Sequence, residues 1–312
     1  MKKALITGGE GFVGGHLRAE LEDNGYQVIS TSRLPKDGFV KMDIKNYEEI
    51  RSVLNEHKPD VIFHLAAIAY VPSSWQDPEL VYEINGLGTV KLLNAARSLG
   101  LLDTIVQIAG SSEEYGLVTE NETLIKETNP LRPLSPYAIS KISADLAGYQ
   151  HFKSWGIKTI RTRAFNHEGP ESKYGPARGD EYVTSTFAKQ VALIEKGKQD
   201  KIMVGDLTSI RDFTDVRDTV RAYRLLIEKG EYGEVYNIGS GKGYTIQQVL
   251  DILIKLAKAE IKVEVDPKRL RPSDVKLLLC DCSKMKKITG WEPEIPFEKT
   301  MEDLLNYWRK VV

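Results

Sequence analysis

Lys3-Ala-Leu-Ile-Thr-Gly-Gly-Glu-Gly-Phe-Val-Gly14 is the segment most informative about the fold of this chain. A short apolar run precedes Gly8, Gly11 and Gly14, and apolar residues then recur at helical spacing as far as Leu21. The glycines therefore stand between an expected strand and an expected helix. Glycines at such a turn allow a tight bend and let an anion approach the N–H groups of the helix. The stretch predicts a loop that holds the pyrophosphate of a dinucleotide.

The second expected strand, Gln27–Ser32, bears on which dinucleotide is held. Sites for NAD commonly place Asp or Glu at the end of this strand, but here Arg33 follows the final serine. A guanidinium matches a phosphate dianion, so this position favours NADP(H) over NAD(H). The alternative is that Arg33 is a solvated loop charge. Asp43 is predicted either to accept from the adenine amino group or to cap the next helix, for which Asn46 competes.

Composition excludes several classes of protein. The 312 residues are 41% hydrophobic, enough for one large or two modest cores, and the net charge of −1 gives no sign of a nucleic-acid partner. No stretch reaches the roughly 20 apolar residues of a membrane span, and no secretory segment precedes the first strand. Cys280 and Cys282 fit neither a disulfide framework nor a zinc site, and the five histidines lack metal-ligand spacing. We expect a cytoplasmic protein that binds no metal.

Strand-like and helical patterns alternate along the first half of the chain. Strands are expected at Ala4–Thr7, Gln27–Ser32, Asp60–Leu65, Thr104–Ala109 and Lys158–Ala164, with helices near Phe12–Asn24, Tyr47–His57, Pro78–Leu99 and Pro136–Trp155. This alternation predicts an α/β fold with a Rossmann-type, doubly wound parallel sheet. We place this domain at residues 1–165, with a return to the sheet near 210–240.

Residues 166–312 are expected to form a smaller α/β lobe that binds the substrate. Helices are predicted near Ser185–Lys196, Val216–Glu228, Thr245–Ala259 and Phe297–Val312, and short strands at Val235–Ile238 and Lys262–Val265. The Gly- and Pro-rich segment Asn166–Tyr182 is long enough for a functional loop.

Three residues are predicted to handle one proton. Tyr137 and Lys141 are four apart, so they share a helix face, and Ser111 follows a strand whose carboxyl end meets the ligand crevice. A tyrosine is a poor base at neutral pH, but a nearby ammonium and a positively charged nicotinamide would lower its pKa. Tyr137 would then exchange a proton with a sugar hydroxyl, while Ser111 holds the same oxygen.

The motifs together resemble the extended short-chain dehydrogenase/reductase family, in its nucleotide-sugar branch. The resemblance covers essentially the whole chain and is carried by these segments: Thr7–Gly14, His64-Leu-Ala-Ala67, Asn85–Thr89, Ser111 with Tyr115-Gly116, Tyr137 with Lys141, Arg163–Pro170, Arg211–Asp218, Leu270–Val275 and Gly290–Pro293. It implies NAD(P) in the first domain, a nucleoside-diphosphate hexose in the second, and a homodimer through a four-helix bundle, with a tetramer as the alternative. The bundle helices would be those at Pro78–Leu99 and Pro136–Trp155.

The resemblance also implies contact residues. Those for the cofactor are Gly8, Gly11, Phe12, Val13, Gly14, Ser32, Arg33, Asp43, Ile44, Leu65, Ala66, Ala67, Tyr137 and Lys141. The later motifs look most like the GDP-mannose group, which implies a GDP-sugar substrate held by Ser112, Asn166, Val183, Thr184, Lys189, Arg211, Arg271 and Asp274. In that group Val183 and Thr184 would border the base, the two arginines would hold the diphosphate and Asp274 the ribose. The alternative for each arginine is a structural ion pair.

Glu113 leaves the reaction open. Family dehydratases place a glutamate two residues after the Ser or Thr of the triad, where it removes the C5 proton, and Glu113 has that offset from Ser111. Reductases of GDP-4-keto-6-deoxy-D-mannose resemble the chain through the same segment and use the triad alone to reduce the C4 ketone. The N-terminal loop, the Arg211–Asp218 segment and the compact length favour the reductase, whereas Ala177–Thr184 is similar to the dehydratases. Another nucleotide-sugar 4-epimerase, or a sensor or scaffold that only binds NADP(H), remains as an alternative, but the complete triad argues against the latter.

Overall fold

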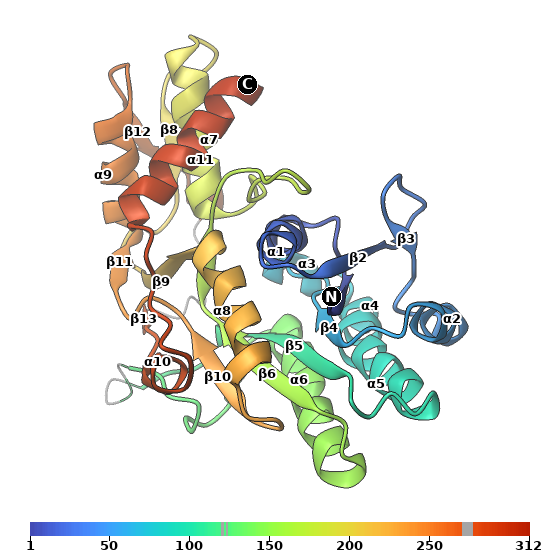
Figure 1. Ribbon diagram of the computed structural model, residues 1–312. Helices are drawn as coiled ribbons and strands as arrows, with labels where there is room; N and C mark the ends of the chain where they lie inside the picture. Colours follow the sequence, from blue (N-terminus) through green and yellow to red (C-terminus); the bar gives the residue numbers. More distant parts are fainter. Residues whose placement is uncertain (120–121, 123, 270–276) are drawn as a thin grey trace.

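A seven-stranded parallel sheet forms the centre of the computed structural model, which describes every residue except 120, 121, 123 and 270–276. Its strand order is β10-β6-β5-β4-β1-β2-β3 (Figure 1). The strands are β1 (Lys3–Thr7), β2 (Gln27–Ser32), β3 (Val40–Lys41), β4 (Val61–His64), β5 (Ile105–Ser111), β6 (Thr159–Ala164) and β10 (Val235–Ile238). The order runs outward in both directions from β1 and β4. The prediction of a Rossmann-type, doubly wound parallel sheet is confirmed.

Helices cover both faces of this sheet. One core joins it to α1 (Phe12–Asp23), α8 (Val216–Lys229) and α10 (Ser283–Thr289). The other joins it to α2 (Tyr47–His57), α5 (Gly88–Ser98) and α6 (Pro136–Trp155). Because both faces are covered, β1, β4 and β6 are almost wholly buried. In β1 and β4 the buried side chains are mostly apolar, whereas β6 also buries Arg161 and Arg163.

The helix that carries Tyr137 and Lys141 has strong signals at both ends. Ser135 caps α6 by accepting a hydrogen bond from the backbone N–H of Ala138 at 3.1 Å, and Pro136 occupies the first helical position. Gly156 ends the helix in the left-handed conformation, at φ 71°. These local signals explain why the predicted bounds Pro136–Trp155 match the observed helix.

The expected helix Pro78–Leu99 is not regular. It consists of α4 (Pro78–Val81), a π-helical segment η1 (Tyr82–Leu87) and α5. The π segment packs against α6, and a Cβ added to Gly86 would lie 3.0 Å from the Ser143 hydroxyl. A short apolar pattern does not distinguish an i→i+5 segment from an α-helix, so the π segment could not be predicted from the sequence.

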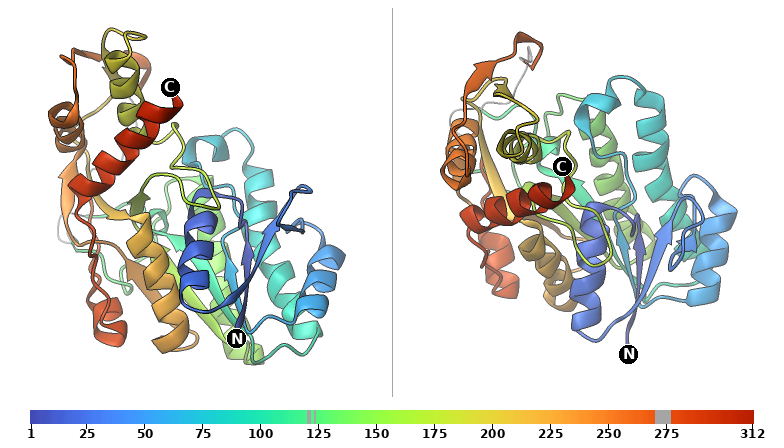
Figure 2. Two further views of the ribbon diagram at one scale, coloured as in Figure 1. Left: turned by 45° about the horizontal axis from the view of Figure 1, so that its top comes forward. Right: turned by 90° about the horizontal axis from the view of Figure 1, so that it is seen from above.

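The rest of the chain forms a second lobe with its own core (Figure 2). Three helices, α7 (Val183–Glu195), α9 (Ile246–Leu256) and α11 (Phe297–Val311), pack together beside the paired strands β8 (Ile202–Val204) and β12 (Val263–Val265). A small sheet of β11 (Gly243–Thr245), β9 (Ile210–Asp215) and β13 (Leu277–Leu278) also includes β7 (Asn166–Glu168), which pairs with β9. The segment Asn166–Tyr182, expected to be a loop throughout, therefore begins as a strand.

The short elements are α3 (Val71–Ser74), η2 (Ser112–Glu114) and η3 (Pro267–Arg269). Within the described part of the chain, no helix is both long and apolar enough to span a membrane.

Candidate active site

The glycine loop after β1 is shaped by close backbone contacts. Gly8 has a positive φ of 67°, and a Cβ on Gly14 would lie 2.5 Å from the Gly8 carbonyl oxygen. Gly11 begins α1 without a side-chain cap, so no side chain competes for the first N–H groups of the helix. The loop thus offers the N–H groups and the close approach that a pyrophosphate needs.

A buried hydrogen-bonded network joins this loop to the next cofactor segment. The Thr7 hydroxyl contacts His64 Nδ1 at 2.8 Å and accepts from the backbone N–H groups of Leu65 and Ala66 at 3.1 and 3.0 Å. His64 Nε2 lies 2.9 Å from the Thr89 hydroxyl. The network fixes the backbone of Leu65 and Ala66 beside the loop, where a Cβ on Gly8 would approach Ala66 to 3.0 Å.

The end of β2 differs in part from expectation. Ser32 is buried and its hydroxyl donates to the Glu10 carboxylate at 2.8 Å, whereas Arg33 is exposed. Ile44 is buried, and Asp43 accepts from the Lys45 backbone N–H at 2.9 Å. The helix α2 is capped by Asn46, not by Asp43. A contact between Asp43 and the adenine amino group therefore stays a prediction.

The predicted triad is assembled at the end of β5. Ser111, Tyr137 and Lys141 are 9, 7 and 6% exposed, and Lys141 Nζ donates to the Ala109 carbonyl at 2.8 Å. Burial lowers the pKa of Lys141 to about 8. Burial raises the pKa of Tyr137 above its ordinary value, whereas hydrogen bonding to Ser111 lowers it. Lys141 Nζ lies 5.9 Å from the centre of the Tyr137 ring.

The segment after Ser111 brings the Glu113 carboxylate close to the triad. The Ser111 hydroxyl accepts from the Glu113 backbone N–H at 3.2 Å, and Ser112 is buried at the start of η2. The Glu113 carboxylate is near enough to Tyr137 for its charge to raise the pKa of the phenol. The triad that a reductase needs and the glutamate that a dehydratase also needs are therefore both present at this site.

The substrate-binding residues predicted in the second lobe occupy different environments. Asn166 donates to the Asp212 carbonyl at 3.4 Å, and Arg211 lies beside it on β9. Thr184 is fully buried and donates to Glu168 at 2.6 Å, so contact with a base would require this hydroxyl to become accessible. Val183 next to it is partly exposed. Arg271 and Asp274 lie outside the described residues.

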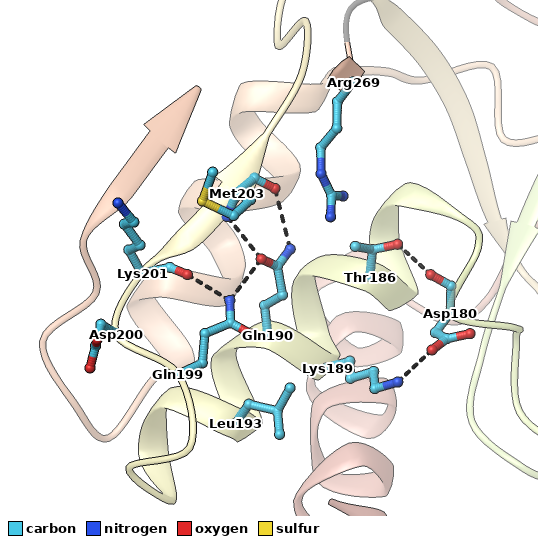
Figure 3. Close-up of a pocket in the computed structure, with 10 residues that line it drawn as sticks. All are labelled: Asp180, Thr186, Lys189, Gln190, Leu193, Gln199, Asp200, Lys201, Met203 and Arg269. Carbon is cyan, nitrogen blue, oxygen red and sulfur yellow. Dashed lines mark hydrogen bonds and ion pairs between the residues drawn. The ribbon is translucent and has the colours of Figure 1, made fainter. Parts of the chain in front are cut away.

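Lys189 lines an open cavity of about 600 Å³ between α7 and β8 (Figure 3). Its Nζ pairs with the Asp180 carboxylate at 2.5 Å, and Arg269 points into the cavity from the opposite side. Gln190 is held at the wall by the Met203 backbone. The lining combines three cations, Lys189, Lys201 and Arg269, with two carboxylates, Asp180 and Asp200, and with amide groups. Its cations can pair with phosphate oxygens, a chemistry suited to a nucleotide.

The sequence reasoning missed an aromatic and cationic cluster whose Tyr182 is close enough to Tyr137 to influence the pKa of its phenol. The Arg178 guanidinium lies 3.5 Å from the centre of the Tyr182 ring and 5.5 Å from that of Phe12. Tyr70, from the loop after β4, meets Tyr182 edge to face at 5.7 Å. Contacts between residues so distant in the chain leave no local pattern, although the unusual length of Asn166–Tyr182 did mark the segment.

The structure combines a dinucleotide loop, a buried Ser-Tyr-Lys triad at the carboxyl end of a parallel strand, and a second lobe. Together these features define an NAD(P)-dependent enzyme of the extended short-chain dehydrogenase/reductase type. Residues 5–304 match the family model described as GDP-mannose 4,6 dehydratase, and the chain belongs to this family.

Three similar proteins place the chain within the family. It is 32% identical to the GDP-6-deoxy-D-mannose reductase of Pseudomonas aeruginosa, covering 100% of this chain and 98% of the relative. It is 30% identical to the GDP-mannose 4,6-dehydratase of Yersinia enterocolitica, covering 98% of this chain and 93% of the relative. The structure of RMD from Pseudomonas aeruginosa complexed with NADPH superimposes with a TM-score of 0.90 at 31% identity, covering all of both chains.

Proposed function

We propose that the protein is an NADP(H)-dependent reductase that converts the C4 ketone of a GDP-4-keto-6-deoxy-D-mannose to an alcohol. The observation that carries the proposal is full-length similarity to a GDP-6-deoxy-D-mannose reductase together with an intact, buried triad. The expected product is a GDP-rhamnose-type sugar. NAD(H) is the alternative cofactor.

The residues of the first domain fit such a cofactor. The glycine loop leaves a cradle that a Cβ would fill, and the uncapped start of α1 presents N–H groups to a diphosphate. Arg33 is exposed where a 2′-phosphate would lie. When bound, the reduced nicotinamide supplies the hydride that the reaction needs.

The triad supplies the proton. Tyr137 is placed to donate its phenolic proton to the C4 oxygen as that atom becomes a hydroxyl. The Lys141 ammonium stabilises the phenolate left behind, and the Ser111 hydroxyl donates a hydrogen bond to the same oxygen. Burial of all three excludes water, which strengthens these interactions.

A GDP-mannose 4,6-dehydratase is the second candidate, because Glu113 lies near Tyr137 and several relatives carry that name. Glu113 would then remove the C5 proton before water leaves C6. Incubation with GDP-mannose and NADP⁺ separates the two activities. A product lighter by one water would establish the dehydratase, whereas unchanged GDP-mannose supports the reductase.

The GDP moiety would lie across the second lobe. The cavity beside Lys189 is large enough for a nucleobase and ribose, and Arg211 lies on β9 of the same lobe. Asn166, Val183 and Ser112 would contact the diphosphate, base and sugar. The roles of Arg271 and Asp274 stay predictions from the family resemblance.

We also propose a homodimer in which η1, α5 and α6 of two copies form a four-helix bundle. Large apolar side chains are exposed on these helices: Tyr82, Leu87, Ile139, Leu146 and Tyr149. A second copy of the same face is their natural partner. A tetramer is the alternative, and a cytoplasmic location stays a prediction.

A further inference from the structure

Glu114, the residue after the proposed dehydratase base, is fully buried behind Ser111. Its Oε1 accepts a hydrogen bond from the Ser111 backbone N–H at 2.8 Å, and its Oε2 accepts one from Arg163 Nε at 3.0 Å. Gly110 makes room for the carboxylate, because a Cβ at that position would collide with Glu114 Oε1. The carboxylate therefore fixes the backbone from which the Ser111 hydroxyl projects.

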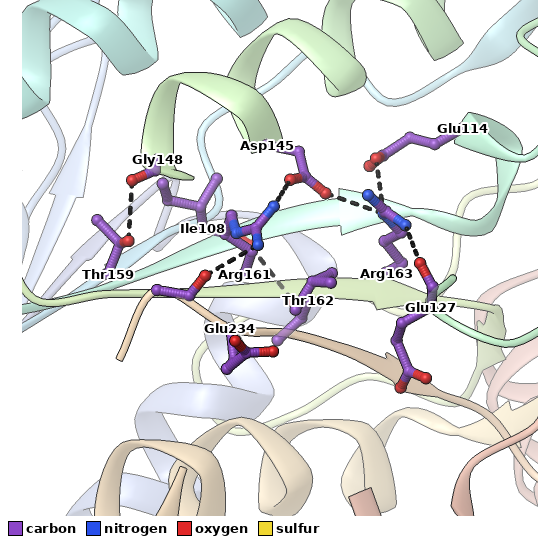
Figure 4. Close-up of polar contacts among 12 residues, drawn as sticks. Ile108, Glu114, Glu127, Asp145, Gly148, Thr159, Arg161, Thr162, Arg163 and Glu234 are labelled. Atoms are coloured by element: carbon purple, nitrogen blue, oxygen red, sulfur yellow. Dashed lines mark hydrogen bonds and ion pairs between the residues drawn. The ribbon is translucent and has the colours of Figure 1, made fainter. Parts of the chain in front are cut away.

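The same network reaches the helix of Tyr137 and Lys141 (Figure 4). Arg163 Nε also donates to Asp145 at 2.9 Å, and Asp145 stands one turn after Lys141 on α6. Asp145 pairs in turn with Arg161, whose Nη2 donates to the Gly233 carbonyl at 2.9 Å. Two carboxylates and two guanidiniums, none more than 7% exposed, thus connect β5, β6 and α6.

Charge couples Glu114 to the triad as well. Burial and the neighbouring Asp145 raise the pKa of Glu114, against the opposing effects of Arg163 and the Ser111 N–H, whose donors face the ionised carboxylate. The Glu114 charge raises the pKa of Lys141, partly offsetting the effect of burial, and also raises that of Tyr137. Loss of the negative charge would therefore let Lys141 lose its proton at a lower pH.

We propose that Glu114 is a positioning residue for the reaction: it holds Ser111 at the end of β5 and, through Arg163 and Asp145, keeps α6 aligned with it. The inference rests on the proposed hydride transfer at C4. It assigns to Glu114 a task separate from that of Glu113, which faces Tyr137. Neither oxygen of Glu114 is free to act on a substrate, because each accepts a hydrogen bond from a buried donor.

Glu114→Gln is the isosteric test. One terminal oxygen of the side chain becomes an NH₂ group, which must then face either the Ser111 N–H or the Arg163 Nε–H. Two facing donors cannot form a hydrogen bond, so the backbone at Ser111 should shift. We expect kcat to fall by about 10²-fold, the scale of a small misplacement at a reacting centre, with unchanged affinity for NADPH. The alkaline limb of the kcat profile should move to lower pH, because Lys141 loses the charge that keeps it protonated.

Two further variants separate positioning from folding. Glu114→Asp keeps the charge but shortens the reach, so kcat should fall by a smaller factor while the alkaline limb stays in place. Asp218→Asn removes a carboxylate of equal burial that accepts from the backbone N–H groups of Glu294 and Ile295, far along the chain from the triad. It should lower the melting temperature and leave the shape of the pH profile unchanged.

The proposal is overturned if Glu114→Gln keeps the wild-type kcat and pH profile, or if Asp218→Asn shifts the profile equally. If Glu114→Gln does not fold, Glu114→Asp decides, and a wild-type kcat in that variant also overturns the proposal. Failure of the proposed function looks different, because the wild-type enzyme itself would not oxidise NADPH with the 4-keto sugar. The variants are then compared in C4 oxidation of GDP-mannose, which needs the same triad.

Discussion

Burial shifts the pKa values of three residues of the candidate site in opposite directions. It lowers the pKa of Lys141 to about 8 and that of His64 to about 3, and it raises that of Tyr137. Removing the charged form of each group from water costs free energy, so each group stays neutral over a wider range of pH. The nicotinamide of the oxidised cofactor is positively charged and would act on Tyr137 in the other direction, which suits the proposed exchange of a proton.

Arg33 provides the clearest prediction for a single residue. Arg33→Asp should weaken binding of NADPH by about 10-fold or more and affect NADH far less, because only NADPH carries the phosphate that a guanidinium pairs with. Titration of the purified protein with each cofactor measures the two dissociation constants. Arg51→Asp, a similar change at an exposed position on α2, is the control. Equal weakening of both cofactors would remove Arg33 from the phosphate site.

His64 should make the folded state sensitive to acid. The unfolded chain protonates this imidazole near its ordinary pKa of 6.5, whereas the folded chain does so only near 3. Its contribution to stability is complete above the upper value and declines as the pH falls between the two, by up to about 1.4 kcal/mol for each pH unit. Denaturant unfolding over this range should show a shallower pH dependence in His64→Gln. An identical slope in both proteins would contradict the buried, neutral assignment.

At the scale of elements, the glycine loop and α1 act as one unit. Gly14→Ala places a Cβ 2.5 Å from the Gly8 carbonyl and 2.7 Å from Gly9 Cα, so strand and helix must separate. We expect loss of cofactor binding with a lower melting temperature. Ala19→Gly, further along α1, costs roughly 1 kcal/mol of helix stability without touching the loop and should keep cofactor binding. Tight NADPH binding by Gly14→Ala would show that the loop tolerates a wider turn.

The elements that the sequence predicted best are those with local signals. Each of these signals lies within a short segment of the chain: the glycines after β1, the Ser135 cap and Pro136 of α6, and the alternation of strands and helices. The π segment η1 and strand β7 were missed because their hydrogen bonds follow from packing against α6 and β9. The buried pairs of Glu114 and Asp145 with Arg163 join residues up to 49 positions apart, so no spacing rule reveals them.

At the scale of the whole molecule, the proposed homodimer would form through the exposed face of η1 and α6. Leu87 and Leu146 are 56 and 49% exposed, and a charge at both should prevent two copies from meeting. We expect Leu87→Glu/Leu146→Glu to run as a monomer in light scattering, while the wild-type protein runs as a dimer. Leu102→Glu changes a residue of similar exposure, 45%, outside these helices and should leave the mass unchanged. A wild-type monomer would contradict the proposed bundle.

The proposed function requires that hydride passes from the reduced cofactor to C4 of a GDP-4-keto-6-deoxy sugar, with Tyr137 as the proton donor. The direct measurement supplies NADPH carrying deuterium at the transferred position, and follows both its oxidation and the mass of the sugar product. We predict that deuterium appears on C4 of the product and that Tyr137→Phe binds NADPH normally but slows the transfer by about 10²–10⁴-fold. A product without deuterium, or full activity in Tyr137→Phe, would contradict the account.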